Sequence, residues 1–429
     1  MKKCIVIGGG FAGLTAAAYL SNSGFQVELL EASPKLGGRA YSFKDNETGS
    51  IIDNGQHIMM GCYHDTLKFI RMIGAEKNFL FQKGLEVNFL NADSELIKLK
   101  SFPFPYPFNL LFGLLNFKAL SFSDRIRFLR FFLKLPFISL EKLNELTVYD
   151  WLIKENQNEK IRKAFWEILS VGALNTNIKK ASALTFAIIL KEIFLKGSKS
   201  ATIILPKFGL SESYCKNAVD FIQKKNGIIN LLESAEKLVI SEGKVIEIET
   251  SKRKITDFDF VVSAVPFYSI KKIVPQLNFQ NQFELSYSSI LSVHIWSKEN
   301  KLKENFYGLI NSPVHWIFNH QDHYTIVISD ANELIEKTKE EIFDIVTAQL
   351  EKFVKIKRSE IISYKIIKEK RATFIPSKEI LFNRPDSKTE FKNLFLAGDG
   401  INTNLPSTIE SAVKSGRAAA DLIINSLES

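Results

Sequence analysis

The sequence is poor in cysteine, and its three cysteines lie far apart. Cys4, Cys62 and Cys215 form no CxxC pair, which excludes a disulfide framework. No cysteine or carboxylate pattern accompanies the histidines either, so we expect no metal site. This usage fits a reducing compartment, namely the cytoplasm.

Long hydrophobic runs are also missing. No stretch reaches the roughly 18 apolar residues that a membrane-spanning helix needs. The uncharged, aromatic-rich run 102–117 carries three prolines in its first half. The apolar run after Met1-Lys2-Lys3 imitates a secretion signal, but it breaks at Gly8-Gly9-Gly10 without a small-residue cleavage site. We therefore expect a cytoplasmic protein without a transmembrane anchor, while attachment to a membrane interface stays open.

Charge is present in both signs, with a basic excess. The chain has 56 basic and 47 acidic residues, a formal net charge of +9. Such a balance permits contact with nucleic acid or with an anionic membrane surface. No nucleic-acid-binding module is visible, so we expect no nucleic-acid partner.

Internal repeats and low-complexity linkers are absent, and 429 residues are too many for one compact core. Strand patterns occur near the start, at 228–266, at 291–328 and at 393–397, whereas 110–195 reads as helical. We predict an α/β fold in two domains. The predicted division gives 1–95, 206–270 and 385–429 to a discontinuous Rossmann-like nucleotide-binding domain, and 96–205 and 271–384 to an inserted α+β substrate domain.

The first forty residues contain a phosphate-binding pattern. A strand at 3–7 leads through Gly8-x-Gly10-x-x-Gly13 into a helix at 14–23 that Gly24 closes, and a second strand runs from 26 to 31. Gly8 permits a tight turn, Gly10 lets a diphosphate approach the backbone, and Gly13 lets helix and strand pack closely. Glu31 ends the second strand, where its carboxylate can accept hydrogen bonds from ribose hydroxyls. The unit predicts a dinucleotide site.

The residues after Glu31 narrow the cofactor to FAD. Leu36-Gly37-Gly38-Arg39 resembles the double-glycine-arginine motif of the amine oxidase and phytoene desaturase superfamily. By that resemblance, Gly37 and Gly38 pass close to the cofactor and Arg39 contacts its diphosphate. A guanidinium is well suited to that partner.

Two later segments resemble other flavin-binding parts of the superfamily. Gly398-Asp399 follows an apolar strand, and the resemblance gives Asp399 a hydrogen bond to the ribityl or diphosphate region. Ile409 begins the last helix at 409–424, with its N–H directed at the flavin pyrimidine. Ala235 would lie beside the adenine, and 261–266 resembles the strand that re-enters the FAD domain.

A more specific resemblance is to the squalene-associated FAD-dependent desaturases, or hydroxysqualene dehydroxylases. It covers residues 1 to about 420 and depends most on Asp53-Asn54-Gly55-Gln56-His57. Five further segments carry it: 60–63, 174–176, 205–211, 314–316 and 371–374. The resemblance implies that reduced FAD donates a hydride to hydroxysqualene, which loses water and becomes squalene.

The same resemblance places the 53–57 loop beside the flavin. Gly55 then contributes to the cofactor site, and Gln56 and His57 are the candidate catalytic residues. His57 either protonates the leaving hydroxyl or orients the ring. His315, next to Trp316, is a candidate pocket residue.

The segment from 102 to 134 predicts a membrane-facing surface. Phenylalanines and prolines lead into a helix that Ser123 opens, with Asp124 in its first turn. That helix mixes apolar residues with Arg125, Arg127, Arg130 and Lys134, a composition that suits an anionic bilayer interface. The alternative is a core helix with a solvated basic face. The membrane-facing interpretation predicts a peripheral protein on the inner face of the membrane. Such a protein takes a hydrophobic isoprenoid substrate, and its position permits contact with squalene-pathway synthases.

Three alternatives remain. A carotenoid (phytoene-type) desaturase or a flavin amine oxidase would carry hydride to the flavin. A non-enzymatic, FAD-stabilised membrane scaffold would show no flavin turnover with any isoprenoid. Nucleic-acid binding has only the net charge in its favour.

Overall fold

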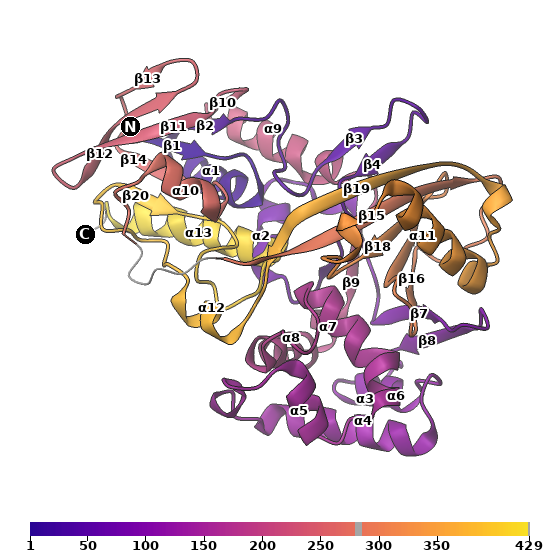
Figure 1. Ribbon diagram of the computed structural model, residues 1–429. Helices are drawn as coiled ribbons and strands as arrows, with labels where there is room; N and C mark the ends of the chain where they lie inside the picture. The colour runs from indigo at the N-terminus through magenta and orange to yellow at the C-terminus, as the bar shows by residue number, and fades with distance from the viewer. Residues whose placement is uncertain (279–284, 428–429) are drawn as a thin grey trace.

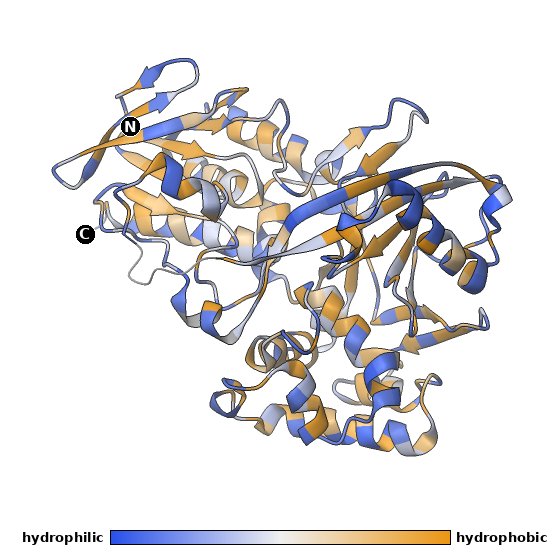
Figure 2. Ribbon diagram, in the orientation of Figure 1, coloured by the Kyte–Doolittle hydropathy of each residue, from blue (hydrophilic) through white to orange (hydrophobic). Residues whose placement is uncertain are grey.

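The computed structural model describes residues 1–278 and 285–427. Figure 1 shows a parallel sheet near both chain termini, a larger sheet beside it, and a separate group of helices below. Hydrophobic residues concentrate along the inner faces of these elements (Figure 2).

The first sheet joins strands from the start, the middle and the end of the chain, all parallel. Its order is β10 (Ile228–Leu231), β2 (Gln26–Glu31), β1 (Lys3–Ile7), β14 (Phe260–Ser263) and β20 (Leu394–Leu396). Parallel strands require crossover connections, which explains why they come from distant segments. Here, β1 and β2 match the predicted strands, and β20 is shorter than the predicted 393–397.

Alternation along β1 (Lys3–Ile7) explains how the sheet is covered on both faces. Cys4 and Val6 pack among the helices, whereas Ile5 and Ile7 pack against the other face. The helical layer contains α1 (Phe11–Asn22), α2 (His64–Met72), α9 (Lys216–Lys224) and α13 (Ile409–Asn425). The opposite layer contains α10 (Phe267–Ile273) and the antiparallel strands β11 (Ala235–Ser241), β12 (Lys244–Thr250) and β13 (Lys254–Ile255).

Helix α1 (Phe11–Asn22) begins three residues before the predicted Leu14, directly after the fingerprint's second glycine. Its N-cap Gly10 offers no side-chain cap, so the first-turn N–H groups stay available. Gly24, with φ of 83°, follows the helix in the left-handed conformation that ends many helices.

The second sheet has seven strands and lies beside the parallel sheet, with the group of helices below (Figure 1). Its order is β19 (Ile361–Phe374), β15 (Tyr287–Ser297), β18 (Tyr324–Ile328), β17 (Trp316–Asn319), β16 (Phe306–Leu309), β7 (Glu86–Leu90) and β8 (Leu96–Lys100). Helix α11 (Lys339–Val354) covers one face. Short strand groups connect the units: β3 (Ser42–Lys44) with β4 (Ile51–Asp53), and β5 (Met59–Met60) and β6 (Phe79–Phe81) with β9 (Ile203–Pro206).

The segment between β8 and β9 is helical, as its sequence predicts. It contains α3 (Phe108–Leu115), α4 (Phe122–Lys134), α5 (Val148–Lys154), α6 (Glu159–Ile161), α7 (Glu167–Leu174) and α8 (Ala183–Leu195), and α12 (Lys378–Asn383) lies much later in the chain. The N-cap of α4 is Ser121 and not the predicted Ser123, because the Ser121 hydroxyl accepts the N–H of Asp124. A serine cap acts three residues upstream of its donor.

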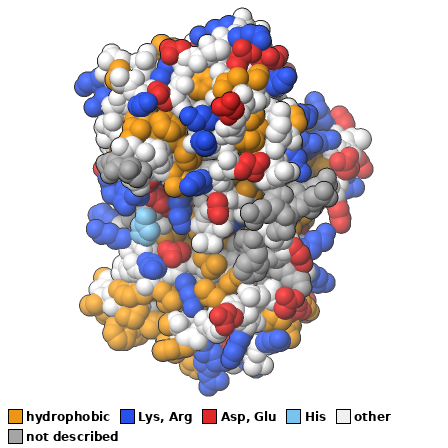
Figure 3. All heavy atoms as spheres, turned by 90° about the vertical axis from the view of Figure 1, so that its left-hand side faces the viewer, with side chains coloured by type: hydrophobic (Ala, Val, Ile, Leu, Met, Phe, Trp, Pro, Cys, Tyr) orange, Lys and Arg blue, Asp and Glu red, His pale blue; other side chains and the backbone are white. Residues whose placement is uncertain are grey.

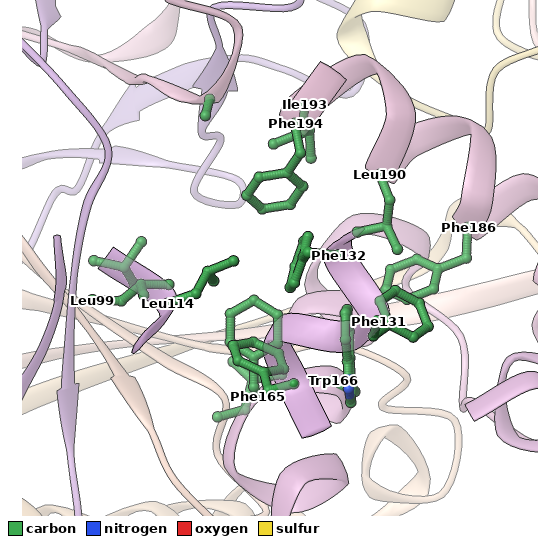
Figure 4. Close-up of a cluster of buried hydrophobic side chains, with 14 of the residues drawn as sticks. Leu99, Leu114, Phe131, Phe132, Phe165, Trp166, Phe186, Leu190, Ile193 and Phe194 are labelled. Carbon is green, nitrogen blue, oxygen red and sulfur yellow. The ribbon is translucent and has the colours of Figure 1, made fainter. Parts of the chain in front are cut away.

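Aromatic side chains form the core of this helical unit (Figure 4). Phe132 stacks on Trp166 with ring centroids 5.5 Å apart, and Phe194 meets Phe132 edge-on at 4.8 Å. Each buried ring contributes about 1.5–3 kcal/mol relative to exposure. Phe165 and Phe194 belong to this core and also line the cavity described next, so the core holds one wall of the site in place.

Candidate active site

A cavity of about 990 Å³ runs from the carboxyl ends of the parallel strands into the helical unit. Crevices at this edge of a parallel sheet are the usual place for a nucleotide. All but one of the candidate cofactor-binding and catalytic residues line it: Gly8, Gly10, Glu31, Gly37, Gly38, Arg39, Gly55, Gln56, His57, Ala235, Gly398, Asp399 and Ile409. Gly13 is the exception and has a packing role.

The fingerprint glycines differ in what surrounds them. A Cβ on Gly13 would lie 1.8 Å from the Gly8 carbonyl oxygen, so helix and strand touch there. A Cβ on Gly10 would have no described atom outside its neighbours nearer than 3.7 Å. Gly10 therefore has no packing reason to be glycine, and the space above it lies in the cavity. That arrangement fits a diphosphate approaching the helix N-terminus.

Glu31 closes the nucleotide end of the cavity. Its Oε2 accepts the N–H of Gly9 at 2.6 Å, and its Oε1 accepts that of Ser33 at 2.8 Å. A carboxylate has about four acceptor sites, so these bonds leave capacity for ribose hydroxyls. They also fix the orientation of the carboxylate.

Arg39 and Asp399 form an ion pair across 360 positions of sequence. Arg39 Nη2 lies 2.5 Å from Asp399 Oδ1, and Nη1 donates to the Ala372 carbonyl at 2.9 Å. Burial alone would raise the pKa of Asp399, but the Arg39 charge and the hydrogen bonds of Arg39 and Ser407 hold that pKa below its ordinary value. The two residues expected near the diphosphate thus meet each other at the cavity wall.

The loop after β4 places Gln56 and His57 in the cavity. His57 Nδ1 lies 2.7 Å from the Gly55 carbonyl oxygen, which accepts only, so Nδ1 carries the proton and Nε2 is bare in the neutral ring. Burial, and secondarily the Arg39 charge, lower the pKa of His57 to about 4. Gln56 Oε1 is buried and has no hydrogen-bond partner among the described residues.

The inner half of the cavity is apolar. Its walls come from β7, β8, α7, α8 and the seven-stranded sheet, with aromatic contributions from Phe89, Phe165, Phe194, Trp316 and Phe318. A Cβ on Gly172 would lie 3.2 Å from Trp316 Nε1, so this glycine keeps the wall open. A glycine inside a helical pattern was the one sequence signal that could have marked it.

Asn175 brings two sequence motifs together. It adopts a left-handed conformation with φ of 48° at the end of α7. Its Nδ2 donates to Thr373 Oγ1 at 3.0 Å, and its Oδ1 accepts the N–H of Asp330 at 2.7 Å. Asn175 and Thr373 both line the cavity. The 174–176 and 371–374 segments therefore belong to one wall.

His315 is not where the sequence led us to expect it. Trp316 lines the cavity, but His315 is absent from the described lining. Its Nδ1 instead accepts the N–H of Ser329 at 3.1 Å. The two neighbours diverge because side chains alternate along an extended chain. Within the described part of the chain, no group of three or more His, Cys, Asp or Glu side chains could hold a metal ion.

Acid is expected to destabilise the fold through its buried histidines. Burial lowers the pKa of His57, His315 and His320 to about 4 and that of His294 to about 3. As pH falls below 6.5, the unfolded chain takes up protons that the native state does not, so stability is lost. We expect the free energy of unfolding to be lower at pH 5.5 than at pH 7.5 by on the order of 3–5 kcal/mol.

The measurement is the urea midpoint between pH 7.5 and 5.5. Carboxyl groups whose pKa burial raises oppose part of this loss, among them Asp53, with a pKa of about 6, and Glu410. His315→Gln should flatten the curve. If the wild-type urea midpoint is the same at pH 7.5 and 5.5, the buried histidines do not destabilise the fold in acid.

The sequence also matches a known protein family. The model of the flavin containing amine oxidoreductases matches residues 11–424. The chain belongs to that family. This flavoprotein is an FAD-dependent oxidoreductase with an α/β Rossmann-like fold.

Several relatives of this flavoprotein cover nearly its whole length. A protein named hydroxysqualene dehydroxylase from Zymomonas mobilis is 28% identical over 99% of this chain and 100% of its own. Proteins of the same name from Sinorhizobium fredii and Rhodopseudomonas palustris are 27% and 26% identical over 99% of both chains. The 15-cis-phytoene desaturase of Glycine max is 24% identical over 99% of this chain and 80% of its own. A solved oxidoreductase from Methanosarcina mazei, 17% identical, superposes with a TM-score of 0.76 over 98% of this chain and all of its own.

Proposed function

We propose that this flavoprotein reduces hydroxysqualene to squalene, with hydride from reduced FAD and loss of water. The observation that carries the proposal is the cavity, in which a dinucleotide cradle opens directly into a long apolar pocket. The relatives named for this activity align with nearly the whole of this chain, over nearly the whole of their own length. An isoprenoid chain needs such an apolar enclosure, whereas a small charged amine does not.

We assign the cofactor contacts to the cavity residues already described. Gly8, Gly10 and the N-terminus of α1 hold the diphosphate, and Glu31 the ribose. Gly37, Gly38 and Gly55 let the chain approach the cofactor closely, and Ala235 borders the adenine. The Arg39–Asp399 pair is placed to turn toward the diphosphate and ribityl chain. Ile409, at the start of α13, would offer its N–H to the flavin ring, where a helix N-terminus stabilises negative charge.

Gln56 and His57 are the polar groups that we assign to the substrate hydroxyl. The bare Nε2 of neutral His57 and the unpartnered Oε1 of Gln56 are acceptors, so they orient the hydroxyl by accepting its proton in hydrogen bonds. The aromatic walls exclude water, and their ring faces attract a developing allylic cation. Reduced FAD, when bound, supplies the hydride.

Anaerobic incubation tests the function. The protein with photoreduced FAD should convert hydroxysqualene to squalene, measured by lipid extraction. A phytoene-type desaturase is the second candidate, because relatives of that name also cover the chain. Reduction of oxidised FAD by phytoene, with no squalene formed, would favour it.

We also propose a two-domain division, with 1–95, 206–270 and 385–429 around FAD and the remainder around the substrate. The sheet pairing argues for an earlier first boundary. Strand β7 (Glu86–Leu90) pairs with β8 and β16 in the seven-stranded sheet.

A peripheral position on the inner membrane face completes the proposal. No helix among the described residues is long and apolar enough to cross a membrane. Seven aromatic side chains between 102 and 137 are exposed: Phe102, Phe104, Tyr106, Phe108, Phe112, Phe122 and Phe137. Hydrophobic side chains also gather on the lower, helical part of the face in Figure 3. We further propose that this surface is where squalene-pathway synthases make contact.

The basic residues of α4 support docking less uniformly than their sequence suggested. Arg125 is turned inward, with Nε donating to the Leu120 carbonyl at 2.9 Å. Arg127 pairs with Asp124 at 3.3 Å but stays exposed, as does Arg130. The aromatic side chains therefore supply the larger part of the proposed contact.

Liposome flotation measures this docking. Wild type should rise with anionic vesicles, and Phe108→Ser with Phe122→Ser and Phe137→Ser should largely abolish flotation. Charge reversal at Arg127 and Arg130 should weaken the free energy of vesicle binding by about 1 kcal/mol per charge. Ile362→Ser, an exposed apolar residue in the other unit, is the matched control. Equal flotation of all variants would exclude this surface.

A further inference from the structure

A cluster of three histidines lies behind the Asp53–His57 loop and does not line the cavity among the described residues. His294 comes from β15, and His320 and His323 from the turn between β17 and β18. Ring centroids lie 5.6 Å apart for His294 and His323, and 4.7 Å apart for His320 and His323. The cluster reaches solvent at Asp322, whose side chain is 55% exposed and whose Oδ1 lies 2.8 Å from His323 Nδ1.

His294 is fully buried between that surface and the loop. Its Nδ1 lies 3.0 Å from Thr325 Oγ1. A hydrogen-bonding interaction with the Asp53 backbone raises the pKa of the ring, but Nε2 has no partner in full hydrogen-bond geometry among the described residues. A buried ring nitrogen without a protein partner normally meets ordered water.

Two further unpartnered polar atoms continue from His294 toward the cavity. Ser292 lies two residues earlier on the same face of β15, and its buried Oγ has no partner among the described residues. It lies 3.7 Å from the position of a Cβ on Gly55. Gln56 Oε1, in the cavity wall, is the next such atom. Such atoms are few in folded proteins, so their succession between solvent and active site indicates a shared partner.

We propose that these groups hold a chain of ordered water that carries protons from Asp322 and His323, through His294 and Ser292, to the cavity at Gln56 and His57. The inference rests on the proposed dehydroxylation. There the C–O bond breaks with its electron pair on oxygen, which takes up the delivered proton and departs as water. The carbon gains a hydride, and the reduced flavin loses two electrons.

The charges around His294 suit a relay. Burial lowers its pKa to about 3, and His323, His320 and Lys365 add to that effect. The ring is therefore neutral near pH 7, with one N–H and one bare nitrogen. It can accept a proton on one side while it releases one on the other.

Hydrogen exchange tests the water path without turnover. With ¹⁵N-histidine in the full-length protein, the His294 ring N–H should exchange with D₂O despite its complete burial. His323→Phe keeps a ring beside Trp296 and should slow that exchange about tenfold or more, whereas His315→Phe should not change it. An unchanged His294 rate in His323→Phe would overturn the path.

Single-turnover kinetics tests the relay. His294→Ala should slow hydroxysqualene-driven oxidation of the reduced enzyme about 10- to 100-fold, with FAD affinity unchanged. Added imidazole should restore the rate, and the solvent isotope effect should increase. A loss that imidazole does not rescue, with an unchanged isotope effect, would reduce His294 to a positioning residue and overturn the relay. If wild type itself does not react, the dehydroxylation fails, while the exchange result still decides the water path. If His294→Ala does not fold, His323→Phe provides the same kinetic comparison.

Discussion

Gly10→Val is expected to lower FAD affinity at least 100-fold, or about 2.7 kcal/mol. The protein itself can accept the side chain. The φ of Gly10 is −80°, which L-residues adopt, and a Cβ there would meet no described atom outside its neighbours nearer than 3.7 Å. The space it would fill is the space that the diphosphate needs at the start of α1. Flavin absorbance per polypeptide and titration of the apoprotein with FAD give the measurement.

Two other glycines separate loss of cofactor from loss of fold. Gly13→Val should unfold the protein, because its Cβ would lie 1.8 Å from the Gly8 carbonyl oxygen. Gly24→Asn should keep both fold and flavin, because Gly24 lies in open space at the end of α1 with a φ that asparagine tolerates. A folded Gly10→Val protein with full flavin occupancy would remove the basis of the cradle assignment.

Hydroxysqualene is expected to oxidise the reduced flavin of this enzyme without oxygen, with one squalene formed per flavin. The direction follows from the substrate, since an ionised allylic alcohol accepts hydride whereas a desaturase substrate donates it. Deuterium on the reduced flavin should appear in squalene, less the fraction exchanged with solvent. Stopped-flow absorbance and mass spectrometry of the product measure both quantities. If hydroxysqualene does not oxidise the reduced flavin, while phytoene or an amine promptly reduces the oxidised flavin, the assignment is reversed.

The pH dependence of the same reaction tests the role of His57. Burial lowers its pKa to about 4, so its charged form is scarce at pH 7 and becomes abundant only below pH 4. If His57 orients the hydroxyl as a neutral acceptor, its own titration leaves the rate level between pH 5.5 and 8. His57→Ala should then slow the reaction about tenfold to a hundredfold at every pH in this range, with FAD still bound. A wild-type rate that falls tenfold per unit above pH 5, and is lost in His57→Ala, would instead identify His57 as the proton donor.

The sequence by itself determined the nucleotide half of this protein. The spacing of Gly8, Gly10 and Gly13 between a buried strand and a helix fixes a local geometry that needs no distant partner, and Glu31 follows within the same unit. The strand at 3–7 is an almost continuous apolar run, as expected for a strand buried on both faces, and the strand at 26–31 completes the β-α-β unit around the glycines. The separate strand-rich segments likewise indicated that the sheet is assembled from distant parts of the chain.

Only the tertiary structure decided the substrate half. The apolar pocket draws on β7, α7, α8 and β17, and nothing local in Phe89, Gly172 or Phe194 reveals that they share a wall. The pairing of Arg39 with Asp399 and the contact of Asn175 with Thr373 also join residues far apart in sequence. The charge state of His57 follows the same rule, because burial and the Arg39 charge set its pKa, and both are products of the fold. Residue type and spacing are local properties, whereas enclosure and electrostatic environment exist only after distant segments have packed together.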